Sequence, residues 1–149
     1  MALAHSIISI NSNLVLTREI GKTTNARELL QTHQDILDHP LLGREVRFLV
    51  SLDSMVEGLI TAEDMASCVP LQQKIMAKCG VCRIAMVAPD DLAFGLSRMF
   101  KSYMESTGHL YGIFDSLDES LAWLNVTEEE AAEIRRQLQE PPDTSPSSD

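Results

Sequence analysis

The sequence predicts an α/β domain with a mixed, mainly parallel sheet of about five strands, helices on both faces and an N-terminal β-hairpin. One observation is the run from Ile84 to Ala88, in which every residue is apolar. Such a run is typical of a strand buried on both faces, as in a parallel sheet covered by helices. A second observation is that strand-like and helical segments alternate after two initial strands, which indicates βαβ units. The length of 149 residues suits one domain with its own core.

We expect this domain to occupy residues 1–140 and to be followed by a disordered tail. Residues 141–149, PPDTSPSSD, consist of proline, aspartate, serine and threonine alone. A segment of this composition has too few apolar side chains to offset the entropy lost on ordering. The fold is therefore expected to end before Pro141.

A hairpin is predicted at the N-terminus. Residues 6–10 and 14–20 are short strand-like runs around the sequence Asn-Ser-Asn, and these residue types favour a turn. In the second run Leu14 and Leu16 share one face and Thr17 lies on the other. Because side chains alternate along a strand, we expect one apolar face and one face that carries the polar residues.

The middle of the chain predicts a helix, a strand and a second helical region. Residues 25–37 open on an asparagine cap and carry apolar residues at helical spacing. Residues 45–52 form the third strand, with an apolar centre. Thr61 and Asp64 then resemble a helix cap. Pro70 either interrupts that helix or occupies the first turn of another one.

The fourth strand, residues 83–88, precedes a strongly amphipathic helix. Asp90 and Asp91 at its start are interpreted as caps, because acidic residues there satisfy free N–H groups and favour the helix dipole. Gly95 is expected to let this helix approach the sheet closely. The side chains expected on its buried face are Leu92, Leu96, Met99, Phe100 and Tyr103.

The C-terminal part predicts one more strand and two short helices. Residues 110–114 form the fifth strand. Ser116 with Glu119, and Thr127 with Glu130, have the spacing of capping boxes. The complete order is ββαβαβαβα with a further helix at the end.

Charge and hydropathy exclude some classes of partner. The formal net charge is −10, from 12 basic and 22 acidic residues. An acidic surface repels phosphate backbones, so we expect a protein partner and no nucleic acid. No apolar run reaches the ~18 residues of a membrane span, and the first residues lack a signal-peptide pattern, so a cytoplasmic location is expected. Phe94 and Tyr111 are surface candidates for a homodimer contact.

The three cysteines, Cys68, Cys79 and Cys82, are expected to be reduced thiols. Cys79 and Cys82 have the C-x-x-C spacing of redox proteins, but that chemistry needs the first thiolate at a helix N-terminus. Here the pair follows a predicted helix and precedes a strand, which favours a structural role. A zinc site needs a fourth ligand, and no nearby histidine provides one. We therefore expect no metal and no cofactor.

Catalytic motifs do not stand out in the sequence. It contains no G-x-S-x-G, no G-x-G-x-x-G and no P-loop. The four histidines are dispersed, and His33 lies near the apolar face of its predicted helix, as a core or boundary residue would. We therefore expect a protein that is not an enzyme.

Asp53 and Ser54 are the candidate functional residues. They directly follow the third strand, at the carboxyl edge of the predicted parallel sheet, where α/β proteins bind ligands. A serine hydroxyl near a helix N-terminus could also accept a phosphoryl group. The alternative is an ordinary turn, in which Asp and Ser are common.

Two segments resemble a known family. The segment RIAMVAPDDLAFGLSRMF, together with IFDSLDESLAWL, is similar to the small bacterial SpoIIAA-like proteins, which are related to STAS domains and more distantly to CRAL-TRIO lipid-binding domains. The resemblance covers about residues 6–125 and rests on the strand IAMVA, the helix behind it and a closing pattern. That pattern comprises Phe114, Glu119, Ser120, Trp123 and Leu124, with Ser120 where alanine is usual.

The resemblance implies a regulatory or protein-interaction module similar to an anti-sigma-factor antagonist, with a kinase or an anti-sigma-like regulator as partner. STAS domains of that type carry a phosphorylatable serine in an Asp-Ser-Ser-Gly turn after the third strand. Here Asp53 and Ser54 match, whereas Met55 and Val56 replace the second serine and the glycine. The alternatives are a carrier for a small apolar ligand or lipid, held between helix and sheet, and a thiol redox protein that uses the C-x-x-C pair.

Overall fold

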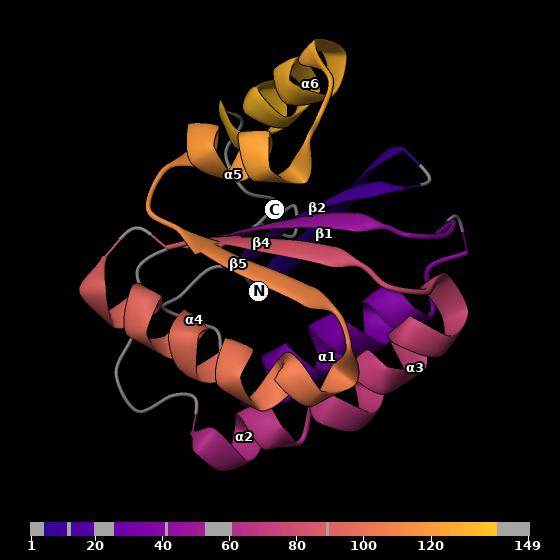
Figure 1. Cartoon of the computed structure of the whole chain (residues 1–149), viewed down its shortest axis with the longest axis vertical. Helices are drawn as coiled ribbons and strands as arrows, with labels where there is room; N and C mark the ends of the chain where they lie inside the picture. Colours follow the sequence, from indigo (N-terminus) through magenta and orange to yellow (C-terminus); the bar gives the residue numbers. More distant parts are fainter. Residues whose placement is uncertain are drawn as a thin grey trace, which may run out of the picture.

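The computed structural model describes residues 5–11, 13–19, 26–40, 42–52, 61–88 and 90–139. The strands form one five-stranded sheet in chain order (Figure 1). β1 and β2 are antiparallel, and each later neighbour is parallel to the strand before it. The predicted mixed, mainly parallel α/β sheet with an N-terminal hairpin is therefore confirmed. The strands are β1 (His5–Asn11), β2 (Leu14–Glu19), β3 (Arg47–Leu52), β4 (Arg83–Val87) and β5 (Leu110–Phe114).

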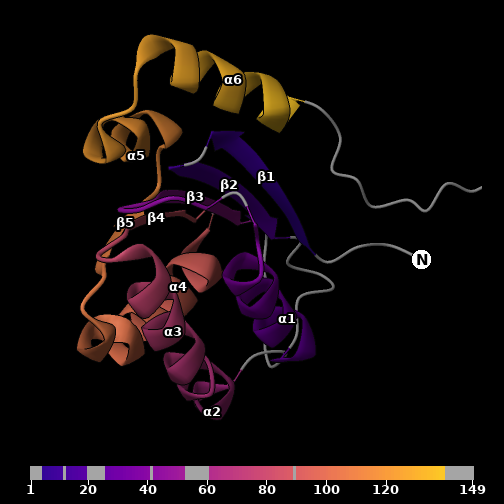
Figure 2. The ribbon, with the colours of Figure 1, turned by 90° about the vertical axis from the view of Figure 1, so that its right-hand side faces the viewer.

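Helices cover both faces of the sheet, as the sequence predicts (Figures 1 and 2). Crossovers of one hand between successive parallel strands carry their helices to the same face. These helices are α1 (Ala26–Leu37), α2 (Ala62–Ala66), α3 (Val69–Cys79) and α4 (Asp91–Met104), and α4 continues into the 3₁₀ turn η1 (Glu105–Thr107). The other face is covered by α5 (Leu117–Leu124) and α6 (Glu128–Gln139). The predicted tail, residues 141–149, lies outside the described residues.

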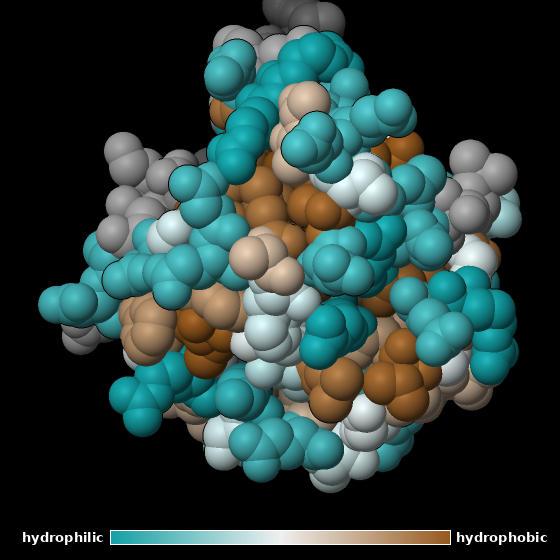
Figure 3. Space-filling view, turned by 45° about the horizontal axis from the view of Figure 1, so that its top comes forward, coloured by the Kyte–Doolittle hydropathy of each residue, from teal (hydrophilic) through white to brown (hydrophobic). Residues whose placement is uncertain are grey.

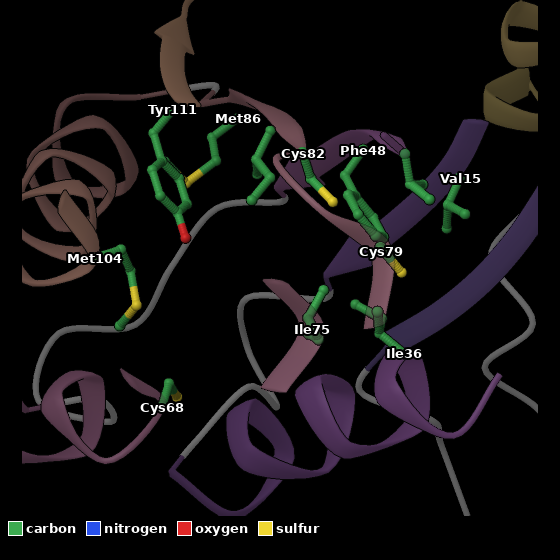
Figure 4. Close-up of a cluster of buried hydrophobic side chains, with 12 residues drawn as sticks. Val15, Ile36, Phe48, Cys68, Ile75, Cys79, Cys82, Met86, Met104 and Tyr111 are labelled. Carbon is green, nitrogen blue, oxygen red and sulfur yellow. The ribbon is translucent and has the colours of Figure 1, made fainter. Parts of the chain in front are cut away.

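The sheet therefore separates two hydrophobic cores. Alternation along β2 sends Leu14 and Leu16 into the core under α5 and α6, and Val15 and Thr17 toward α1–α4. None of these four residues is more than 1% exposed. The expectation of a separate polar face on this strand is wrong, because helices cover both of its faces. In the core under α1–α4, Phe48, Met86 and Tyr111 from the sheet are drawn with Ile36, Ile75 and Met104 from the helices (Figure 4).

Helix starts follow the predicted caps. Thr61 and Asp64 form a complete capping box at α2, and Thr127 and Glu130 bond reciprocally before α6. The Ser116 hydroxyl accepts from the backbone N–H of Glu119, and Asp90 accepts from the N–H of Ala93. Pro70 occupies the first turn of α3, so it opens a second helix. The asparagine cap predicted for α1, Asn25, lies outside the described residues.

The buried face of α4 differs from the expected one. Met99 is 41% exposed and Tyr103 is 38% exposed, although both were expected in the core. The buried positions are Ala93, Ser97 and Met104. Phe100, also expected on this face, packs against the core under α1–α4. The large apolar side chains suggested a face rotated toward Met99 and Tyr103, whereas the buried face includes the small residues Ala93 and Ser97 together with Met104.

Gly95 lies on the exposed side of α4, so the expectation that it allows a close approach to the sheet is wrong. A Cβ atom built at Gly95 meets no atom within 4 Å. Because alanine is the better helix former, we expect Gly95→Ala to raise the free energy of unfolding by about 0.5–1 kcal/mol. Urea unfolding measures this change, and an unchanged or lower stability would contradict the assigned position of Gly95.

Hydrophilic residues cover much of the surface seen from the side of α5 and α6, with hydrophobic residues in separate patches (Figure 3). Tyr111 is only 7% exposed, so it cannot form the surface dimer contact expected from the sequence. Among the helices in the described ranges, none is long and apolar enough to cross a membrane.

Candidate functional site

A cavity of about 110 Å³ lies between the sheet and the layer of α1–α4. Its floor includes Thr17, Val50 and Met86, which are neighbours in register across β2, β3 and β4. Leu52, the last residue of β3, also lines it. The cavity is thus close to the carboxyl ends of the parallel strands, where open α/β sheets bind ligands.

The remaining wall comes from the four helices and is mostly apolar. Ile36 and Ile75 belong to it, and Figure 4 shows both beneath the strands. On α4 the wall includes the small residues Ala93 and Ser97, which leave space between this helix and the sheet. A concave site with an apolar lining and a few polar groups is the usual form of a small-molecule site. The other lining residues are Thr32, His33, Phe48, Met65, Gln72, Ile84, Leu96 and Phe100.

Three polar atoms of residues that line the cavity have no hydrogen-bond partner within the described part of the chain: Thr17 Oγ1 on the sheet side, and Gln72 Oε1 and Ser97 Oγ on the helix side. The three residues are 1%, 6% and 4% exposed, respectively. Buried polar atoms in native proteins are nearly always paired, and an unpaired one costs about 1–3 kcal/mol. Their presence around one cavity therefore indicates a place where a polar group of a ligand can bind.

An aromatic contact also belongs to the lining of the cavity. The ring of His33 on α1 lies 5.7 Å from the ring of Phe100 on α4, centroid to centroid, with the planes tilted by 46°. His33 is 6% exposed, which agrees with its interpretation as a core or boundary residue. Both residues line the cavity, so two helices contribute aromatic rings to its lining.

A buried histidine, His109, connects α3 to the residue before β4 through two hydrogen bonds. The backbone N–H of Cys82 donates to Nδ1 of His109 at 3.0 Å. The other nitrogen, Nε2, must then carry the proton of the neutral ring, and it donates to the backbone oxygen of Gln72 at 3.1 Å. Burial lowers the pKa of His109, although the Gln72 carbonyl opposes this shift. The neutral imidazole thus ties α3, which carries the Gln72 amide, to the start of β4.

The C-x-x-C pair has the properties of buried structural thiols. Cys68, Cys79 and Cys82 are free and buried. Cys79 ends α3, and burial raises the pKa of its thiol. Burial also raises the pKa of Cys82, to about 12. A reactive thiol needs the opposite shift. No group of three or more metal-ligating side chains occurs in the described ranges.

The two candidate residues from the sequence, Asp53 and Ser54, lie outside the described residues. Asp90, the other acidic residue singled out, caps α4 by accepting from the N–H of Ala93 at 2.9 Å. Gln72 and Ser97 were not among the residues singled out from the sequence, and Thr17 was expected on a polar face of its strand. A signal for Ser97 was present, because it lies one helical turn after Ala93 on a face of small residues.

Comparison with protein-family models, with curated proteins and with solved structures finds no match for this chain.

Proposed function

We propose that this protein is a binding module for a small, mainly apolar molecule, which it holds between the sheet and α1–α4. The observation that carries the proposal is the pairing of an apolar cavity with three buried polar atoms that have no partner among the described residues. An apolar wall favours an apolar ligand body, and a few polar groups fix its orientation. This function is the ligand-carrier alternative that the sequence left open.

The size of the cavity restricts the ligand. An engineered apolar cavity of about 150 Å³ in another protein binds benzene. A cavity of about 110 Å³ is of the same order, so we propose a ligand with one ring or a short chain. The aromatic pair of His33 and Phe100 on the wall favours a flat ring.

We propose binding without chemistry at this site. The unpartnered groups are two hydroxyls and one amide. None of them ionises near neutral pH, so they are suited to hold and orient a ligand rather than to transfer a proton. This agrees with the lack of enzyme motifs in the sequence.

The test is a binding screen with toluene, indole, hexanol and hexanoate. Because a ligand that binds only the folded state stabilises it, a concentration of 100 times Kd should raise the free energy of unfolding by about 2.7 kcal/mol. We expect at least one ring compound to raise the melting temperature in a saturable manner. If none does at millimolar concentration, the proposed function is wrong.

The regulatory function implied by the SpoIIAA-like resemblance is a separate proposal. It rests on the sequence pair Asp53-Ser54, which directly follows the cavity residue Leu52 in the chain. Incubation with cell lysate and ATP, followed by mass spectrometry, tests it. A phosphate on Ser54 would support a kinase as partner, and an unmodified Ser54 under many conditions would remove the phosphorylation switch.

A further inference from the structure

We infer that the ligand is uncharged and carries a hydroxyl on its apolar ring or chain, as a phenol or a short alcohol does. This inference rests on the proposed function, because it concerns the same cavity. It goes further by assigning the chemistry that Thr17, Gln72 and Ser97 would recognise. These residues come from β2, α3 and α4, so three separate elements each bring to one cavity an oxygen that has no partner among the described residues.

The hydroxyl of Ser97 on α4 lacks the hydrogen bond that is usual for a helical serine. A serine or threonine within or at the end of a helix commonly satisfies its hydroxyl by donating to a backbone oxygen one turn earlier. Ser67, Thr107 and Ser120 do so in this molecule, at 2.9, 2.6 and 2.6 Å. Ser97, in the middle of α4, does not make this bond although it is only 4% exposed. Its hydroxyl is therefore available to a molecule in the cavity.

Thr17 reaches the cavity from the sheet. Its neighbours in register are Ile7 on β1 and Val50 on β3, and neither side chain can pair with a hydroxyl. The residue is 1% exposed, so bulk water does not solvate its Oγ1 atom. A hydroxyl at this position of a buried strand is explained by a polar ligand atom rather than by a contact within the sheet.

Gln72 indicates that the polar group of the ligand donates a hydrogen bond and is uncharged. Its unpartnered atom is the amide oxygen, which accepts hydrogen bonds and cannot donate. An ionised carboxylate also only accepts, so it would leave this oxygen unpaired. A neutral hydroxyl can donate to Gln72 and accept from Ser97 or Thr17, both of which can donate. A neutral hydroxyl therefore fits the polar groups around this cavity better than a carboxylate or a pure hydrocarbon.

The experiment compares phenol, toluene and benzoate, which share one ring and differ in a single substituent. Their Kd values would be measured by NMR titration of the full chain at pH 7. In an apolar cavity without polar partners, toluene should bind better, because the phenol hydroxyl would lose its hydrogen bonds to water. We expect this protein to bind phenol at least as tightly as toluene, and benzoate more weakly than either.

Three variants test which residues cause the preference for phenol over toluene: Ser97→Ala, Thr17→Val and Gln72→Met. At least one of them should lower the preference for phenol over toluene tenfold or more, while its Kd for toluene stays within about threefold of wild type. Gly95→Ala, on the exposed side of α4, is the control and should leave the preference unchanged. Ser97→Ala should also raise the melting temperature without ligand, because it removes an unpaired buried hydroxyl.

The outcomes separate this inference from the proposed function. If toluene binds in the cavity but phenol binds more weakly than toluene, or benzoate binds more tightly than phenol, the cavity is a ligand site and the hydroxyl assignment is wrong. The assignment is also wrong if the preference for phenol is the same in all three variants. If no ring compound binds, the proposed function itself fails.

Discussion

Ala93→Leu is expected to abolish ligand binding without loss of stability. Ala93 is fully buried on α4 and lines the cavity, so a larger side chain there occupies the space that a ligand would take. Filling an existing cavity commonly stabilises a protein by about 0.5–2 kcal/mol. We therefore expect a higher melting temperature without ligand and no further rise when toluene or phenol is added. Thermal unfolding with and without ligand measures both effects.

The matched control is Ala132→Leu on α6, which makes the same chemical change at an exposed position on the other side of the sheet. This variant should bind ring compounds as the wild type does. Two results would contradict the assigned cavity: retained binding in Ala93→Leu, or a loss of stability of about 1–3 kcal/mol, which is typical of an overpacked core.

Glu130→Gln is expected to lower the free energy of unfolding by about 2–3 kcal/mol, the largest stability effect that we predict for an ion pair. Glu130 on α6 forms a bidentate pair with Arg47 on β3, at 2.7 and 3.1 Å. The carboxylate also accepts from Asn11 Nδ2 at 2.8 Å and from the N–H of Thr127 at 2.9 Å. The side chains of Arg47 and Glu130 are only 18% and 12% exposed. The pair therefore fastens α6 to the sheet.

The pH dependence of this contribution follows from its pKa. Burial alone would raise the pKa of Glu130, but the hydrogen bonds from Arg47, Thr127 and Asn11 outweigh it and lower the pKa from 4.5 to about 2. Between these values the unfolded chain binds more protons than the folded one. The stabilisation is thus complete above pH 4.5 and is lost as the pH falls toward 2. Urea unfolding over this range should show a steeper loss in the wild type than in Glu130→Gln.

Asp118→Asn is the control for the ion pair. Asp118 bonds to Arg135 at 2.6 Å, but the two side chains are 80% and 46% exposed. Exposed pairs contribute little, because water and salt screen them. This variant should therefore leave stability and its pH dependence nearly unchanged. Equal losses in Glu130→Gln and Asp118→Asn would show that burial does not strengthen the pair with Arg47.

The strands, their succession along the chain and several helix starts could be predicted from the sequence because each rests on local chemistry. The apolar run of β4 and the cap residues Thr61, Asp90 and Thr127 predict their elements with little reference to the rest of the chain. The interpretation of Thr127 and Glu130 was correct but incomplete. The sequence shows the capping box, whereas the pair with Arg47 depends on where α6 meets the sheet.

The cavity could not be predicted because it is the volume left over when several elements pack together. Two of its polar residues, Thr17 and Ser97, were misplaced because strand alternation and helical periodicity were read from the sequence alone. Thr17 was assigned to a polar face of β2, although helices bury both faces of that strand. The buried face of α4 was predicted from its largest apolar residues, whereas the buried positions of this helix are Ala93, Ser97 and Met104. Periodicity alone cannot report how much space remains between a helix and a sheet.

The most direct test of the binding proposal is a methyl NMR titration with toluene and phenol. Ile36, Ile75 and Ile84 line the cavity, whereas Ile134 is fully buried in the core on the other face of the sheet. We expect saturable shifts of the three cavity methyl groups, ligand contacts to the same groups, and no change at Ile134. Shifts that do not saturate, or that affect Ile134 as strongly as Ile75, would contradict a ligand site between the sheet and α1–α4.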